Sequence, residues 1–364
     1  MASQTVSQIT PQKEIEKSKV DAFLEKAVSD FGAAVSAALV VVGDKLGLYK
    51  AMAGAAPMNS AELAARTGTH ERYIREWLIN QAAGGYIEYD PASGKYTMTD
   101  EHAAALADDQ SPFFVGGGFQ VITAMIKADE RITKAFRTGQ GMFWGEHHQD
   151  LFEGTERFFR PGYAAHLVSD WIPALDGVKP RLEAGALVAD IGCGYGASTI
   201  IMAKAFPKSR FYGFDNHAPS IVHARSEAFH SGVASSAFFD IAGATNFPNA
   251  GGYDFIAFFD CLHDLGDPVG SLKRARETLN NDGVVMVVEP MAAETVEGNL
   301  NPIGRVYSGA SVLCCTPNAI ASGQTALGTL AREKDLRQVA RQAGFSRFRK
   351  ACETPMNRVF EVRP

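Results

Sequence analysis

The sequence predicts an α/β protein with three parts, which are an N-terminal winged-helix domain, a helical cap and a seven-stranded sheet. Three observations predict this organisation. From Leu187 onward, short apolar runs alternate with helical patterns, as in a parallel sheet with helices on both faces. A glycine-rich loop follows the first of these runs. In the first third of the chain, a helix-turn-helix pattern precedes two β-rich runs around a turn.

Composition limits the class of protein. The chain has 364 residues, of which 46% are hydrophobic and 21% charged, enough for two or three domains with ordinary cores. The net charge of -6 does not favour a global attraction to nucleic acid or to an anionic membrane. Residues 1–20 are polar, without the apolar centre of a signal peptide, and no apolar run approaches the roughly 20 residues of a membrane span.

The five cysteines are odd in number and lack the spacing of a metal site, so they favour a reduced compartment over a disulfide framework. We therefore expect a soluble, cytoplasmic protein.

Residues 1–110 are predicted to hold N-terminal helices and the winged-helix domain. A helical pattern runs from Ile15 to Tyr49, and its middle, Ala33–Val42, is too apolar for a solvated helix. We expect this stretch to be buried against a neighbouring domain or a second subunit. The sequence therefore predicts a homodimer built through the N-terminal domain.

The helix-turn-helix pattern follows. Ser60 is expected to cap its first helix and Gly68 to end it, and Thr69 is expected to cap a second helix that runs to about Ala83. The stretch Tyr86–Thr97 then has two β-rich runs around a Pro/Ser/Gly turn, which predicts the hairpin wing of a winged helix.

A helix that reads DNA presents basic and amide side chains to the groove and its phosphates. Here Arg72 and Arg75 are accompanied by Glu71 and Glu76, and the tip of the wing offers only Lys95. We therefore expect dimerisation and coverage of the partner domain, with no nucleic-acid partner. A cofactor-sensing, DNA-binding regulator remains the alternative.

Residues 111–180 are rich in aromatic side chains and are expected to form a linker and cap over the active site. Adjacent histidines beside a tryptophan and several glycines are unusual for a core. A metal site formed by these histidines and His166 is not expected, because no cysteine or carboxylate cluster joins them at ligand spacing. The candidate substrate-binding residues are Trp144, His147, His148 and Tyr163.

Residues 181–364 are expected to form the sheet domain. The last two predicted strands are joined by only five residues, 353–357, which is short enough for an antiparallel hairpin. The stretch 291–330 is an insertion long enough to serve as a lid. The predicted strands are 187–191, 210–214, 236–240, 254–259, 283–289, 347–352 and 358–363.

The loop after the first strand indicates the type of ligand. Its spacing, with Gly192, Gly194 and Gly196, is G-x-G-x-G and differs from the G-x-G-x-x-G loop that faces a pyrophosphate. Asp190 stands two residues before the first glycine, where a carboxylate can reach an ammonium group directly or through water. This motif resembles the first motif of the class I S-adenosylmethionine-dependent methyltransferases, whose Rossmann-like sheet also has seven strands and ends in a hairpin.

Acidic residues follow the next three strands as well. Asp215 lies 19 residues after Gly196, where an acid would bind ribose hydroxyls, and the pair Asp240-Ile241 would suit an adenine. A nicotinamide-dependent dehydrogenase is the weaker alternative, because the third glycine comes one residue early and no second mononucleotide motif follows. The predicted residues for binding S-adenosylmethionine are Asp190, Gly192, Gly194, Gly196, Asp215, Asn216, Asp240, Ile241 and Asp260.

The pair His263-Asp264 resembles the H-D-W motif of the winged-helix O-methyltransferases. In that family the histidine is the general base that removes the proton of an acceptor hydroxyl, and a carboxylate after the fifth strand orients it. The resemblance implies His263 and Glu289 for these two roles. Leu265 replaces the tryptophan, and Phe259 stands where plant members carry a lysine. These departures leave open that His263 only packs beside the cofactor.

Over nearly its whole length the chain resembles a bacterial and mycobacterial group of winged-helix methyltransferases of uncertain substrate. This resemblance implies an enzyme that transfers a methyl group from S-adenosylmethionine to a small, aromatic or apolar acceptor, at a hydroxyl if His263 is a base. Methyl transfer to nitrogen, carbon or sulfur without a base is the alternative.

Overall fold

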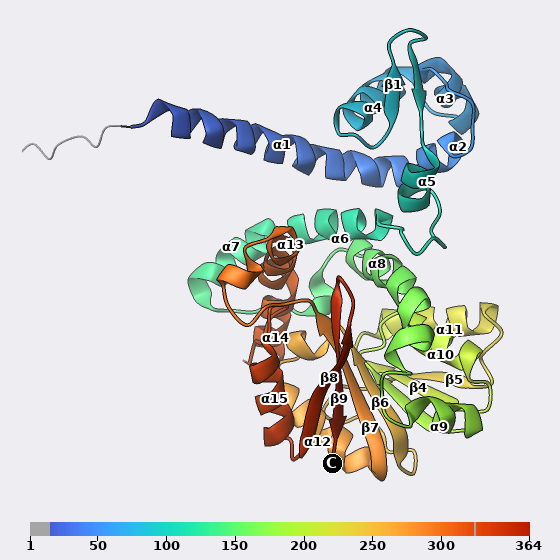
Figure 1. Ribbon diagram of the computed structural model, residues 1–364, viewed down its shortest axis with the longest axis vertical. Coiled ribbons are helices and arrows are strands. Elements are labelled where there is room, and N and C mark those ends of the chain that lie inside the picture. Colours follow the sequence, from blue (N-terminus) through green and yellow to red (C-terminus); the bar gives the residue numbers. More distant parts are fainter. Residues whose placement is uncertain (1–14, 324) are drawn as a thin grey trace, which may run out of the picture.

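The computed structural model describes residues 15–323 and 325–364, and Figure 1 shows a small N-terminal unit, a large sheet and a layer of helices between them. Helix α1 (Lys17–Lys45) leads into the short helix α2 (Leu48–Met52). The helix predicted from Ile15 to Tyr49 is thus broken, because Gly47 has a φ of 68°, a conformation that ends α1 and begins α2.

The winged helix forms where the sequence predicts it. It consists of α3 (Ser60–Thr67), α4 (Glu71–Ala83) and the antiparallel pair β1 (Glu88–Asp90) and β2 (Lys95–Thr97). The predicted caps Ser60 and Thr69 are wrong. The cap of α3 is Asn59, whose side chain accepts the backbone N–H of Glu62 while the Glu62 carboxylate accepts the N–H of Asn59. The cap of α4 is His70.

The N-terminal part of helix α1 extends beyond the rest of the chain, whereas its C-terminal part lies between the winged helix and α6 (Figure 1). Only four of its residues are buried, namely Ser36, Ala37, Val40 and Gly43. The apolar middle of the helix is therefore largely exposed within a single chain. Contrary to the sequence prediction, α1 is also long and apolar enough to cross a membrane by length and composition, with a mean hydropathy of 1.5 over 18 residues.

Helices α5 to α9 connect the winged helix to the sheet. Buried Asp150 accepts hydrogen bonds from Lys45 at the end of α1 (2.9 Å) and from Lys127 after α6 (3.0 Å). These cations lower the pKa of Asp150 although burial opposes the charge. The bounds are α5 (Asp100–Leu106), α6 (Gly116–Ile126), α7 (Asp129–Thr138), η1 (Trp144–Glu146), α8 (Asp150–His166), η2 (Leu167–Trp171) and α9 (Val178–Ala184).

The sheet has seven strands in the order β5-β4-β3-β6-β7-β9-β8. The first five in this order are parallel, and β9 pairs antiparallel with both β7 and β8, which confirms the predicted sheet and its final hairpin. The strands are β3 (Leu187–Ile191), β4 (Arg210–Asp215), β5 (Ala237–Ile241), β6 (Tyr253–Phe259), β7 (Leu279–Pro290), β8 (Arg347–Glu353) and β9 (Asn357–Arg363).

Strand β7 begins four residues earlier than predicted. The asparagine-rich stretch before Gly283 has the composition of a turn, but Leu279 pairs with Tyr253 of β6, across a register shift, and this pairing extends the strand. Neighbouring strands otherwise stay close to their predicted ends, so the carboxyl ends of β3, β4, β5 and β6 meet at one edge of the sheet.

Helices cover both faces of the sheet because side chains alternate along each strand. On β3, Val188 packs into one core with α9, α10 (Ala197–Ala205) and α11 (Ala218–His230). Ala189 packs into the other core with α12 (Pro268–Thr278) and α15 (Glu333–Gln342). The predicted insertion is helical and packs near α6, α7 and α8. It holds η4 (Glu297–Asn299), α13 (Pro302–Ala310), η5 (Ser311–Cys315) and α14 (Thr316–Ser322).

Candidate active site

The glycine loop follows β3 at the carboxyl edge of the sheet and leads into α10. Gly192, Gly194 and Gly196 all have positive φ, at 72°, 52° and 85°, which explains the choice of glycine at each position. A Cβ on Gly192 would lie 2.9 Å from the Cys261 sulfur, whereas one on Gly194 would meet no atom within 4 Å. Gly194 lines a cavity, so the space beside it is where a ligand can approach the backbone.

Asp190 is buried below this loop and is 1% exposed. Its Oδ2 accepts hydrogen bonds from the hydroxyls of Ser198 and Thr199, both at 2.6 Å, whereas its Oδ1 has no partner among the described residues. Burial raises the pKa of Asp190 to about 6, although the two hydroxyls favour the charged form. Asp190 itself does not line the cavity, whereas Ser198, which donates to it, does.

Asp215 ends β4 and lines the same cavity. Its carboxylate accepts the backbone N–H groups of Gly194 (2.9 Å) and His217 (2.8 Å), so it ties the glycine loop to the next strand. Asn216 also lines the cavity.

Two other predicted cofactor-binding residues, Asp240 and Ile241, do not line the cavity. Asp240 accepts a hydrogen bond from Arg225 at 3.2 Å, and the loop of residues 242–245 contributes to the cavity wall instead.

The cavity at this edge has a volume of about 660 Å³, within the ~300–1,000 Å³ of small-molecule sites. Aromatic rings from α8, η1 and β6 form much of its wall. The aromatic lining residues are Trp144, Phe152, Phe159, Tyr163, Tyr195 and Phe259. Among the residues that the structure describes, every charged side chain that lines it is acidic, and these are Glu156, Asp215, Asp260, Asp264 and Asp267. The cavity therefore favours a cationic or neutral ligand over an anionic one.

His263 lies in η3 (Leu262–Asp264), directly after β6, and is 3% exposed. Its Nδ1 lies 2.8 Å from Oε2 of Glu289, which is fully buried on β7, and the backbone N–H of His263 donates to Oε1 at 3.2 Å. An ionised carboxylate only accepts, so Nδ1 carries the proton and a neutral ring has its lone pair on Nε2. The predicted pair of His263 and Glu289 is thus brought together.

Burial opposes a positive charge on His263, but the Glu289 carboxylate and Cys315 favour it, and the pKa of His263 is raised above its ordinary value of 6.5. His263 does not itself line the cavity, although its neighbours Cys261 and Asp264 do.

Asp260 directly follows β6 and has a φ of 49°, and no other non-glycine residue in the described ranges has a positive φ. Its Oδ2 accepts a hydrogen bond from the Tyr163 hydroxyl (2.9 Å), and its Oδ1 accepts one from the Asn357 side-chain amide (2.7 Å). Burial, followed by the nearby Glu289 charge, raises the pKa of Asp260 to about 7. A strained backbone at a cavity wall is typical of functional sites.

The candidate substrate-binding residues divide into two groups. Trp144 and Tyr163 line the cavity. His147 and His148 do not. Neither ring nitrogen of buried His147 has a partner among the residues described, and burial lowers the pKa of His147 to about 4. The exposed ring of His148 lies near Lys127 and accepts the backbone N–H of Asp150.

Two residues that sequence reasoning did not select also contribute to this region. Asn318 of α14 accepts the backbone N–H of Trp144 (2.9 Å) and donates to the carbonyl of Asp264 (3.0 Å). Asn357 holds Asp260 from the start of β9. Both residues lie far along the chain from their partners, so no local spacing could have indicated them.

Two family models match the chain. Residues 33–108 match the "Rv2258c-like winged HTH domain", and residues 182–344 match the "Methyltransferase domain". This chain carries a methyltransferase domain behind an N-terminal winged-helix domain.

Among curated relatives, the chain is similar to the tRNA U34 carboxymethyltransferase of Campylobacter lari, with 32% identity over 114 residues. The match covers 30% of this methyltransferase and 38% of the relative, so the chain spans about two fifths of the length of that protein.

Two solved structures are similar over almost the whole chain. The mitomycin 7-O-methyltransferase has a TM-score of 0.69 at 20% identity, with 95% of this chain and 99% of that one covered. Human N-acetylserotonin methyltransferase, in complex with S-adenosylmethionine, has a TM-score of 0.65 at 17% identity, with 93% and 97% covered. At these identities the likeness establishes the fold.

The residues of this methyltransferase fit S-adenosylmethionine as cofactor. The open space at Gly194 and the exposed side of Asp215 both lie in the cavity wall, and Asp190 is buried below the same loop with one unpaired oxygen among the described residues. The acidic lining suits a cation, and the cofactor carries a sulfonium and an ammonium group.

Proposed function

We propose that this protein transfers a methyl group from S-adenosylmethionine to a hydroxyl of a small, aromatic or apolar acceptor. The observation that carries the proposal is the buried contact between His263 and Glu289, 2.8 Å long, beside a cavity with an aromatic wall. A histidine whose other nitrogen is held by a carboxylate is arranged as a general base.

The bound cofactor supplies a methyl group on a positively charged sulfur. The chain then has two tasks, which are to align the acceptor behind that methyl group and to take up the acceptor's proton. In the proposed reaction, Asp215 and the glycine loop hold the cofactor, and Trp144 and Tyr163 position an acceptor ring. His263 takes the hydroxyl proton at Nε2, and Glu289 keeps the ring oriented and stabilises the imidazolium that forms.

Calorimetric titration tests cofactor binding, and we expect S-adenosylmethionine and S-adenosylhomocysteine to bind more tightly than NAD. Methyl transfer is then measured with a labelled cofactor and a panel of small phenols, with the matching anilines and thiophenols as comparison. Label transferred to the phenols alone supports the hydroxyl. Transfer to the anilines or thiophenols alone would contradict it, and tighter binding of NAD would overturn the cofactor.

We further propose that the protein is a cytoplasmic homodimer. In α1, apolar side chains recur at heptad spacing, as in helices that pair, and four of them are more than half exposed. Phe31 is 69% exposed and Val28 is 65% exposed. An apolar stripe of this length is the feature that a second copy would cover. The exposed members of the stripe are Leu24, Val28, Phe31, Val35, Ala38 and Val42.

Sedimentation tests the dimer. We expect the full chain to be dimeric, and Phe31→Asp with Val35→Asp to shift it to monomers, because charges would be buried in the interface. Val222→Asp, at a residue on α11 that is 66% exposed, is the matched control. A monomeric wild-type chain, or one that floats with lipid vesicles through α1, would contradict the dimer.

We also propose that the chain divides into residues 1–110, 111–180 and 181–364.

The winged helix weighs against a role in reading DNA, because the cations of α4 and of the wing are paired. Arg72 and Arg75 contact Glu76 and Glu71, and Lys95 of the wing contacts Glu62. A gel-shift experiment with genomic fragments at physiological salt should therefore show no specific complex.

A further inference from the structure

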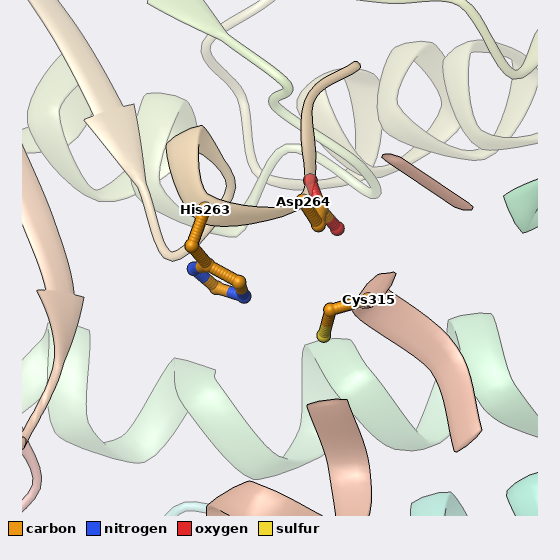
Figure 2. A group of neighbouring side chains, drawn as sticks. All are labelled: His263, Asp264 and Cys315. Carbon is orange, nitrogen blue, oxygen red and sulfur yellow. The ribbon is translucent and has the colours of Figure 1, made fainter. Parts of the chain in front are cut away.

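Three potential metal ligands meet beside the cavity. One ligand atom each from His263, Asp264 and Cys315 lies within 4.8 Å of the other two, as Figure 2 shows. His263 and Asp264 come from η3 after β6, whereas Cys315 comes from η5 in the distant insertion. The fold, rather than a sequence motif, therefore assembles this group.

The histidine is already oriented as metal-binding histidines are. Its Nδ1 faces the Glu289 carboxylate at 2.8 Å, so Nε2 is the nitrogen left for a ligand bond. Metal-bound histidines almost always donate their second ring N–H to a carboxylate, a carbonyl or water in this way.

We infer that His263, Asp264 and Cys315 form a zinc-binding site with an open fourth position. Three protein ligands with one open position are typical of accessible zinc sites, and a thiolate with an imidazole selects zinc over magnesium or calcium. Asp264 lines the cavity, so the group borders the place where ligands enter.

The distances require only a small adjustment. With zinc–nitrogen and zinc–sulfur bonds of about 2.0–2.3 Å, tetrahedral ligand atoms lie about 3.5 Å apart. The three atoms are at most 4.8 Å apart, so an ion would draw them together by roughly 1 Å. Rotation of the Cys315 and Asp264 side chains can supply such a shift without a change in the backbone.

Charge balance also favours the ion. The Glu289 carboxylate lies 2.8 Å from His263, and the carboxyl groups of Asp260 and Asp264 line the cavity beside it. One thiolate and one carboxylate would neutralise a divalent zinc ion, so the loaded site would carry no net charge from its own ligands. It would not repel a cationic cofactor bound in the same cavity.

The site has a consequence for catalysis, which rests on the proposed function. The Nε2 lone pair cannot bind zinc and accept a proton at the same time. Bound zinc therefore removes the general base, and methyl transfer to a hydroxyl should be inhibited by zinc while cofactor binding is retained.

The test begins with zinc binding alone, without any acceptor. The chelator-treated full chain is dialysed against zinc, and bound metal is measured by mass spectrometry. Cobalt is used in parallel, since a thiolate ligand gives a near-ultraviolet charge-transfer band. We expect one ion per chain and a thiolate band. Cys315→Ser should abolish the band, and Glu289→Gln should weaken zinc binding by about 10–100-fold.

Cys352→Ser is the matched control, because Cys352 lies on β8 outside the group and should leave the band unchanged. S-adenosylhomocysteine binding, measured for each variant, shows that the fold is intact. Zinc binding that survives in Cys315→Ser, or a cobalt complex without a thiolate band, would overturn the site. Stoichiometric zinc binding without inhibition would leave the site standing and remove His263 as the base.

Discussion

The two ends of the cavity are built in different ways. At the proposed cofactor end, the wall is formed largely by backbone groups and by residues at strand ends. Gly194 exposes its backbone, and Asp215 accepts hydrogen bonds from two backbone N–H groups. At the proposed acceptor end and directly behind its wall, side chains meet from segments far apart in the chain, such as Tyr163 with Asp260 and His263 with Glu289. The first end depends on space for a ligand, and the second depends on the orientation and charge of buried groups.

The largest expected effect is a loss of cofactor binding, caused by a substitution at the proposed cofactor end of the cavity. Gly194→Val should abolish binding of S-adenosylhomocysteine, because the branched side chain fills the ligand's space and a φ of 52° strains it. Calorimetric titration measures the dissociation constant of S-adenosylhomocysteine. Gly232→Val is the matched control, since Gly232 has a φ of 72°, open space around its Cβ position and no place in the cavity wall. Equal losses in both variants would show that strain alone is responsible.

The next effect tests the acceptor end. His263→Ala should lower turnover by about 10²–10⁴-fold, the range of general-base assistance, with an almost unchanged dissociation constant for the cofactor. Turnover and calorimetry are measured on the same preparation, with His230→Ala on α11 as the control. A rate within a few-fold of wild type would remove His263 from the mechanism and favour methyl transfer to nitrogen, carbon or sulfur without a base.

A smaller effect is expected for Glu289→Gln, because the ring loses its orienting charge but remains in place. The wild-type rate should rise with pH as His263 loses its proton, with an inflection above 6.5, since Glu289 outweighs burial and raises the pKa of His263. In Glu289→Gln the rising part of the pH–rate profile should move to lower pH. A rising part that stays at the same pH would show that Glu289 does not control the titration of His263.

The smallest effect concerns stability at the acceptor end. Tyr163→Phe removes the 2.9 Å hydrogen bond to Asp260, which keeps its bond from Asn357. We expect a loss of about 1 kcal/mol in the free energy of unfolding, measured with denaturant. Tyr73→Phe, at a residue that is 79% exposed, should change nothing. An unchanged stability for Tyr163→Phe would mean that this contact contributes little in solution.

Much of the fold could be predicted because its signals are local. Six of the seven strands begin within one residue of the prediction, since alternation and glycine boundaries lie within each segment. The glycine loop was evident for the same reason. The start of β7 was missed because pairing with Tyr253 overrides the turn composition of its first residues. Along α1, the sequence reveals an apolar stretch but not that a single chain leaves it largely uncovered.

By itself, the sequence determined the order of strands and helices, the glycine loop and the acids at the strand ends, because periodicity, backbone freedom and short spacings act between near neighbours. The resemblance to known methyltransferases already implied that Glu289 orients His263. Only the tertiary structure decided that Tyr163 and Asn357 both donate hydrogen bonds to Asp260, and that Cys315 lies beside His263. These contacts join residues tens of positions apart. Their geometry depends on how the helices pack over the sheet, which no local pattern encodes.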